Sequence, residues 1–109
     1  MNFRHITLVF ALLVPTAALA TSGFDFEGNV ENGRKLYEAK CVACHISLVG
    51  GDGTALHTRP NRRIKTGEEL ITRVQGCNHQ IKAGLTSQQI NDIIAHLYKA
   101  YYKQLSVAN

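Results

Sequence analysis

The stretch Cys41-Val42-Ala43-Cys44-His45 is a C-x-x-C-H motif, and the rest of the chain is organised around it. Two closely spaced thiols followed directly by an imidazole form the attachment site of a c-type haem. On one turn of helix, Cys41 and Cys44 can each form a thioether with a haem vinyl group, while the ring of His45 ligates the iron. The sequence therefore predicts one covalently attached haem c held by Cys41, Cys44 and His45.

Two other uses of closely spaced cysteines fit less well. A zinc site would need two more soft ligands at close spacing, whereas the chain has one further cysteine, Cys77, and no second C-x-x-C. A thioredoxin-like dithiol pair would be expected in a βαβ pattern, which the sequence does not show. The haem interpretation is therefore favoured.

The N-terminus has the features of a secretory signal. Arg4 precedes an apolar run over residues 6–14, and Ala18-Leu19-Ala20 is an A-x-A cleavage site. The run is too short to span a bilayer, although an uncleaved amphipathic anchor is an alternative. We expect residues 1–20 to be a signal peptide and residues 21–109 to form one exported domain in a bacterial periplasm, with no membrane span after cleavage. Export agrees with haem c, because this cofactor is attached outside the cytoplasm.

Size and charge limit the possible functions further. A domain this small often needs a staple for stability, and a covalently held haem can serve as the centre of its core. The formal net charge of +4 is too weak to indicate general nucleic-acid binding. Cys77 is left unpaired after haem attachment, and an odd thiol in an exported protein requires an explanation.

Local patterns predict three helices. Asn29 can cap a first helix that continues to about Cys44 and carries the haem motif at its C-terminal end. Gly33 interrupts this helix, which indicates a close crossing with another helix. Residues 46–65 are predicted to be irregular because of a glycine cluster.

The two later helices each begin with a capping box. Thr66 and Glu69 start a short helix that is predicted to stop near Gly76, followed by a loop over residues 77–84. A second box at residues 86–89 starts the last helix. Its apolar residues recur at steps of three and four and form one broad face: Ile90, Ile93, Ile94, Leu97, Tyr98 and Tyr101.

The segment predicted to be irregular is basic. It contains His57, Arg59, Pro60, Arg62, Arg63 and Lys65. The ordinary interpretation is a solvated basic surface. A sharper one is that Arg59 and Arg62 hydrogen-bond the haem propionates, because a guanidinium fork matches a carboxylate. The remaining cations can form a docking face for an acidic partner protein.

This order of elements resembles class I cytochrome c over nearly all of residues 21–109. The resemblance implies an all-α fold of three to four helices wrapped around one haem c, and a redox carrier rather than an enzyme. Gly33 and Tyr37 are similar to a glycine and aromatic pair on the family's first helix, which packs against the last helix, here at Leu97 or Tyr98.

The chain departs from this family at the distal ligand of iron. The family normally uses a Met thioether there, and this chain's only methionine is Met1. Four other groups compete for the position. His96 lies inside the last helix, and His57 lies early, in the basic segment. Cys77 and His79 both fall in the predicted loop that ordinarily carries the methionine.

A narrower resemblance bears on this choice. Residues 73–77 and 101–103 are similar to a branch of small monohaem cytochromes c with His/Cys axial ligation from anaerobic ammonium-oxidising bacteria. It implies Cys77 as the distal ligand, with His79 as the alternative and a free or intersubunit-disulfide Cys77 as a third possibility. It also implies binding of NO or CO and pairing with a related monohaem subunit.

These ligands lead to two functional hypotheses. A thiolate stabilises ferric iron, so a His45 and Cys77 centre predicts a low-potential electron-transfer protein with a redox partner protein. The alternative is a haem-based binder or sensor of NO or CO, which would displace the distal ligand. The aromatic residues Tyr98, Tyr101 and Tyr102, with Leu105, weakly indicate a partner subunit; otherwise they cover the haem edge or the first helix.

Overall fold

The computed structural model describes residues 11–13 and 26–105. The expected signal peptide, residues 1–20, lies almost wholly outside these ranges, and so does the end of the chain from residue 106. In the described ranges, no helix is both long enough and apolar enough to cross a membrane.

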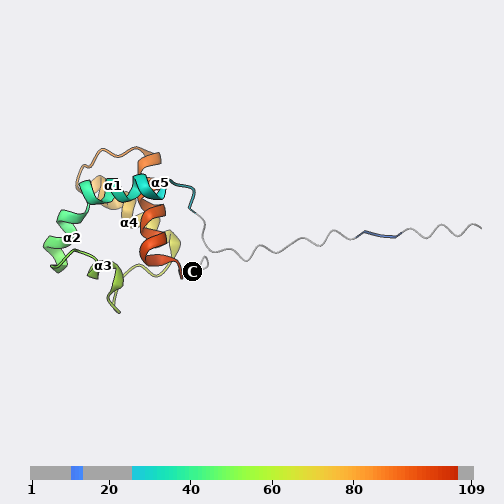
Figure 1. Ribbon diagram of the computed structural model, residues 1–109, viewed down its shortest axis with the longest axis horizontal. Helices are drawn as coiled ribbons and strands as arrows, with labels where there is room; N and C mark the ends of the chain where they lie inside the picture. Colours follow the sequence, from blue (N-terminus) through green and yellow to red (C-terminus); the bar gives the residue numbers. More distant parts are fainter. Residues whose placement is uncertain (1–10, 14–25, 106–109) are drawn as a thin grey trace, which may run out of the picture.

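The described residues form helices and no strands, so the predicted all-α fold is confirmed. The described residues form five α-helices, labelled in Figure 1, and a short π-helical turn, η1, that continues the last of them. In chain order they are α1 (Val30–Lys40), α2 (Val42–Val49), α3 (Ala55–Thr58), α4 (Gly67–Gln80), α5 (Ser87–Leu97) and η1 (Tyr98–Tyr102).

The close crossing predicted at Gly33 is between α1 and α5. A Cβ atom at Gly33 would lie 1.8 Å from the backbone oxygen of Asp92, so only glycine lets the two backbones approach this closely. Tyr37, one turn further along α1, is buried in the same core as Leu97. The predicted packing of the first helix on the last is therefore confirmed. In the described residues, the main cluster of buried side chains consists of Tyr37, Leu70, Ile93, Ile94, Leu97, Tyr102 and Leu105.

A buried carboxylate ties the start of α1 to α5. Asp92 is only 4% exposed, and its Oδ1 accepts hydrogen bonds from the Asn29 backbone N–H at 2.8 Å and from Gln88 Nε2 at 3.0 Å. Its Oδ2 accepts from Asn32 Nδ2 at 2.7 Å. The side-chain bond from Asn32 is the main reason that the pKa of Asp92 lies below its usual value. Asp92 therefore holds α1 against α5 as an ionised group.

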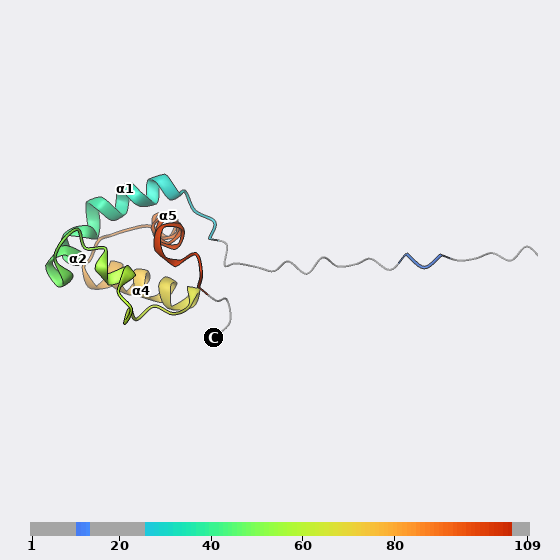
Figure 2. The ribbon, with the colours of Figure 1, turned by 60° about the horizontal axis from the view of Figure 1, so that its bottom comes forward.

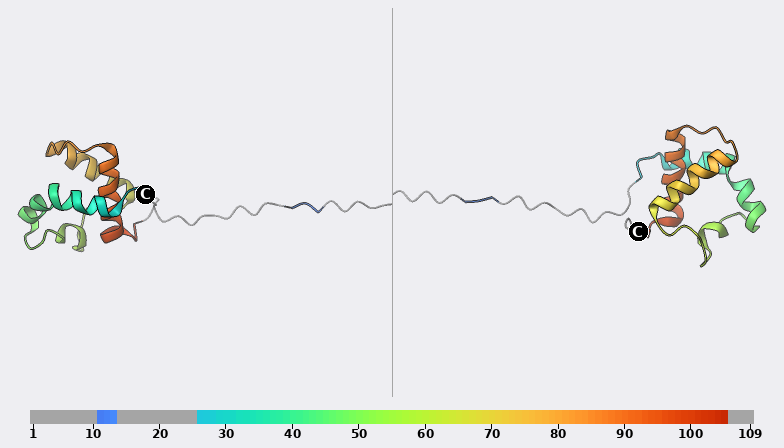
Figure 3. Two further views of the ribbon diagram at one scale, coloured as in Figure 1. Left: turned by 45° about the horizontal axis from the view of Figure 1, so that its top comes forward. Right: turned by 180° about the vertical axis from the view of Figure 1, so that it is seen from behind.

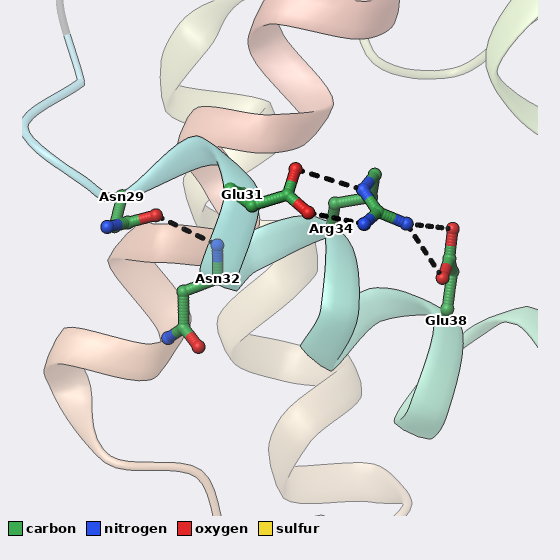
Figure 4. Close-up of polar contacts among 5 residues, drawn as sticks. All are labelled: Asn29, Glu31, Asn32, Arg34 and Glu38. Carbon is green, nitrogen blue, oxygen red and sulfur yellow. Dashed lines mark hydrogen bonds and ion pairs between the residues drawn. The ribbon is translucent and has the colours of Figure 1, made fainter.

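The first turn of α1 and its exposed face carry the polar contacts drawn in Figure 4. The Asn29 side chain accepts a hydrogen bond from the Asn32 backbone N–H, as expected for a helix cap. Arg34 pairs with Glu31 and Glu38, one turn to either side. These ion pairs are exposed, so their contribution to the stability of the protein is small.

The predicted single helix to Cys44 is wrong, because the chain bends at Cys41. The backbone there has φ −118° and ψ −36°, away from ideal helix values. The motif therefore lies in the first turn of α2, not at the end of α1. α2 continues to Val49 and ends at Gly50, which has φ 74°. The segment predicted to be irregular thus contains the second half of α2 and the single turn α3.

The predicted loop over residues 77–84 is also shorter than expected. α4 passes through Gly76 and ends at Gln80, so Cys77 and His79 lie in its last turns. Gly76 does not adopt a positive φ; the chain leaves the helix instead at Lys82, with φ 53°, and Gly84, with φ 67°. Figure 3 shows α4 crossing α5 when the molecule is seen from behind.

Both predicted caps form. Thr66 Oγ1 accepts from the Glu69 backbone N–H at 3.1 Å, although the Glu69 carboxylate accepts from the Lys65 N–H rather than that of Thr66. At the start of α5, the Thr86 and Gln89 side chains accept from each other's backbone N–H, which is a complete capping box.

The aromatic end of the chain belongs to its own core. Tyr102 is 1% exposed and Leu105 is 7% exposed. These two side chains are therefore not available to contact a partner subunit, and they do not support the presence of one.

Candidate haem site

A cavity of about 560 Å³ lies at the centre of the helices. Figure 2 shows its frame, with α1 and α4 on opposite sides and α2 at one end. Much of its wall is apolar and includes Leu70, Val74, Leu85, Ile93 and Leu97. Cavities that hold drug-sized ligands or cofactors measure about 300–1,000 Å³ and are mainly apolar, so this one has a suitable size and lining.

The motif residues Cys41, Cys44 and His45 all line this cavity. Cys41 and His45 are half-buried, and Cys44 is exposed. The loop after α2 passes close to His45, because a Cβ atom at Gly53 would lie 2.9 Å from the His45 Cβ. Gly53 also has φ 83°, which a larger residue adopts only with strain.

The protonation of Cys41 bears on the alternative of a dithiol redox pair. Burial, reinforced by the nearby Cys77 and Cys44, raises the pKa of Cys41 to about 11. Reactive redox cysteines have the opposite property, a lowered pKa that favours the thiolate. All three cysteines are free thiols. The site is therefore unlike a dithiol redox centre.

The two main candidates for the distal ligand lie on different faces of α4. Cys77 is half-buried and lines the cavity, together with Asn78. His79 is exposed and is not among the lining residues. A helix advances about 100° per residue, so side chains two positions apart point in nearly opposite directions. The structure brings Cys77 to the same cavity as His45 and turns His79 away from it.

The other two histidines have structural contacts. His96 is half-buried, and its ring lies 5.6 Å from that of Tyr37. His57 was expected on a solvated surface, and this is wrong, since it is 4% exposed. The turn α3 carries it inward, where it bonds to two tyrosine hydroxyl groups. Burial is the main reason that the pKa of His57 is lowered to about 4, which leaves it neutral at neutral pH.

His45 and three further side chains form a hydrogen-bonded series. The Tyr37 hydroxyl lies 2.7 Å from Nδ1 of His45 and 2.8 Å from Nε2 of His57. The Tyr102 hydroxyl lies 2.7 Å from Nδ1 of His57. The sequence offered no signal for this series, because its members come from α1, α2, α3 and η1 and only the tertiary fold brings them together.

The arginines of the basic segment have different positions. Arg59 lines the cavity, and its buried Nε has no hydrogen-bond partner among the described residues. Arg62 does not line it: its Nη1 donates to the backbone oxygens of His57 at 2.9 Å and Tyr101 at 3.0 Å. Arg63, one of the cations that the sequence offers for a docking face, also lines the cavity, and so does Arg73.

These residues fit a bound haem. The two motif thiols and His45 share an apolar cavity, and the buried Arg59 Nε is a donor that lacks an acceptor, which a propionate can supply. No group of three or more His, Cys, Asp or Glu side chains in the described residues can hold a bare metal ion. An iron atom at this site would depend on a macrocycle for its other ligands.

Comparison with known proteins supports this assignment. The model of the family described as "cytochrome C oxidase, cbb3-type, subunit III" matches residues 28–97, well over half of the chain. The match includes the motif, the cavity helices and Cys77. Neither the curated proteins nor the solved structures gave a significant match. The chain belongs to this cytochrome c family and is a class I c-type cytochrome, a haem-based electron-transfer protein.

Proposed function

We propose that this chain is an exported monohaem cytochrome that carries electrons at low potential, with His45 and Cys77 as the axial ligands of iron. The observation that carries this proposal is the single cavity lined by Cys41, Cys44, His45 and Cys77. Bound haem c supplies the one-electron couple of iron. An electron carrier needs no substrate site, and we propose no enzymatic reaction for the chain.

Each residue has a role that follows from its position. Cys41 and Cys44 provide the thiols that attach the cofactor. His45 offers Nε2 to the metal, since no hydrogen bond from the described residues occupies this atom. The apolar wall excludes water from the site, and Arg59 provides a buried donor for a propionate.

Cys77 determines the expected potential. A thiolate donates electron density to ferric iron and stabilises it, so a His and Cys pair has a lower reduction potential than a His and Met pair. Ferric iron also lowers the pKa of a coordinating thiol. The exposed His79, on the other face of α4, provides a matched control for this role.

Mass spectrometry and a redox titration test the proposal. The mature protein should begin at Thr21 and carry one covalent haem, and a variant with both Cys41→Ala and Cys44→Ala should carry none. Cys77→Ala should shift the reduction potential upward, whereas His79→Ala should leave it unchanged. A potential that moves with His79 and not with Cys77 would assign the distal ligand to His79.

A second candidate function is the binding of NO or CO. It is favoured by the position of Cys77, which lines an outer cavity beside Gly76 and Gln80 as well as the central one. A ligand that enters through this outer cavity would reach Cys77 in its wall. With haem bound, Cys77 would be the side chain that such a gas displaces from the iron.

Absorption spectra of the reduced protein, with and without CO, test this second function. We expect a CO-induced shift in the native protein, and a faster shift in Cys77→Ala because no ligand must first leave. Spectra of the native protein that do not respond to CO would remove the gas-binding function and leave electron transfer.

The redox partner is proposed to be an acidic protein. The exposed Arg63 and Arg73 line the haem cavity and place positive charge beside it. The rate of electron exchange with such a partner should fall as salt is added. Pairing with a related monohaem subunit rests on the resemblance alone, and sedimentation of the holo-protein tests it.

A further inference from the structure

We propose that Tyr37, His57 and Tyr102 are positioning residues that fix the orientation of His45 and increase its electron donation to iron. The inference rests on the proposed function, because it takes His45 as the ligand of haem iron. It concerns a series of hydrogen bonds that begins at Nδ1 of His45, the ring nitrogen that would remain free if Nε2 bound iron.

The direction of these hydrogen bonds follows from the chemistry of the metal bond. If Nε2 of His45 gives its lone pair to iron, Nδ1 must carry the proton, so it donates to the Tyr37 hydroxyl oxygen at 2.7 Å. The Tyr37 O–H is then free to donate to Nε2 of His57 at 2.8 Å. His57 in turn donates from Nδ1 to the Tyr102 oxygen at 2.7 Å. Each group in the middle donates one bond and accepts one.

Such a series strengthens the first bond. A metal-bound histidine that donates its other N–H to a good acceptor becomes a more basic ligand. Tyr37 is a better acceptor when its own proton is donated onward, because hydrogen bonds in a chain polarise one another. The acceptors beyond Tyr37 therefore act on iron through His45, and their influence should decrease along the series.

The surroundings keep water from replacing these partners. Tyr37, His57 and Tyr102 are 6%, 4% and 1% exposed. The ring of Tyr101 stacks on His57, with centroids 4.8 Å apart and planes 12° apart. The Arg62 guanidinium lies 4.7 Å from the centroid of the Tyr102 ring. If a hydroxyl is removed from this series, its neighbour keeps a donor or acceptor without a hydrogen-bond partner, and water does not readily reach that group.

Three tyrosine-to-phenylalanine variants of the holo-protein test the inference by redox titration. Tyr37→Phe keeps the ring and removes the acceptor of His45, so the reduction potential should move to more positive values. Tyr102→Phe should move it in the same direction by a smaller amount. Tyr98→Phe is the matched control: its hydroxyl donates to the Lys103 backbone oxygen, outside the series, and its loss should cause no shift.

A second readout follows the proton itself. In protein with 15N-labelled histidine, the Nδ1 proton of His45 should exchange slowly with solvent, and it should exchange faster in Tyr37→Phe than in Tyr98→Phe. The inference would be overturned if Tyr37→Phe had the same reduction potential and the same exchange rate as the Tyr98→Phe control. A larger shift in Tyr102→Phe than in Tyr37→Phe would also overturn it.

Failure of the proposed function is distinguishable from failure of the inference. Native protein that carries no covalent haem would refute the proposed function before any variant is compared. If Tyr37→Phe does not take up haem, Tyr102→Phe decides: a positive shift supports the series, and an unchanged potential contradicts it.

Discussion

Individual residues of this cytochrome have roles that their type and position explain. Gly33 allows two helix backbones to meet, Asp92 joins those helices as a buried carboxylate, and Cys77 faces the haem cavity where the family normally supplies a methionine. Single substitutions at these positions should therefore have large and specific effects.

The substitution Gly33→Ala should destabilise the protein strongly. The added Cβ would overlap the Asp92 backbone oxygen, and backbone cannot move aside as a flexible side chain can. Overpacking of this kind costs about 1–3 kcal/mol or more. Denaturant unfolding of the holo-protein measures it.

Gly76→Ala is the matched control for Gly33→Ala. Gly76 also lies within a helix, but a Cβ atom there has no heavy atom within 4 Å. Alanine should stabilise the helix at this position by about 0.5–1 kcal/mol. Equal effects of the two substitutions would contradict the close approach at Gly33.

Asp92 should make the stability of the protein sensitive to acid. The bond from Asn32, with those from Asn29 and Gln88, lowers the pKa of Asp92 in the folded state. The contribution of Asp92 to the free energy of unfolding is therefore complete above the ordinary pKa of a carboxyl group. It is lost as the pH falls through the lowered pKa of Asp92 in the folded state. Asp92→Asn should cost about 1–3 kcal/mol at neutral pH and progressively less in acid. A deficit in melting temperature that does not change with pH would contradict this.

At the scale of the elements, sequence patterns predicted the helix starts better than the helix ends. The caps at Asn29, Thr66 and Thr86 depend on short-range hydrogen bonds that a few residues encode. The ends of α1 and α4 depend on distant contacts. Gly76 does not stop α4, because a glycine ends a helix only where the backbone turns to positive φ.

The capping box of α5 provides a prediction at this scale. Thr86→Ala removes the acceptor of the Gln89 N–H and should lower the free energy of unfolding by about 0.5–2 kcal/mol. Ser87→Ala, one residue later, is the control, because the helix cap does not use its side chain. Thermal unfolding of both variants measures the difference. Similar losses would mean that the box does not stabilise α5.

For the whole molecule, the sequence predicted the cofactor and the fold class, and the structure added the arrangement of the site. The C-x-x-C-H motif is local and specific, so Cys41, Cys44 and His45 could be selected from spacing alone. The burial of His57 and the turn of Arg62 toward Tyr101 could not, because both depend on α3 packing against η1. Features that depend on residues close together in the sequence could be predicted, and features that depend on contacts between distant residues could not.

The central cavity should make the fold depend on haem. Without a cofactor, the apolar wall of this open cavity of about 560 Å³ would face water, which is a large loss for a domain whose whole stability is about 5–15 kcal/mol. The variant with Cys41→Ala and Cys44→Ala should therefore lose helix, as measured by circular dichroism. Hydrogen exchange should increase most in α2 and α4, which line the cavity. Native helix content without haem would contradict this dependence.

X-ray absorption at the iron edge of the oxidised protein tests the account most directly. The thioether sulfurs of Cys41 and Cys44 attach to the macrocycle and not to the metal, so sulfur bound to iron must come from Cys77. We predict a sulfur neighbour in the native protein and in His79→Ala, and its loss in Cys77→Ala. A first coordination shell of nitrogen or oxygen alone in the native protein would contradict it.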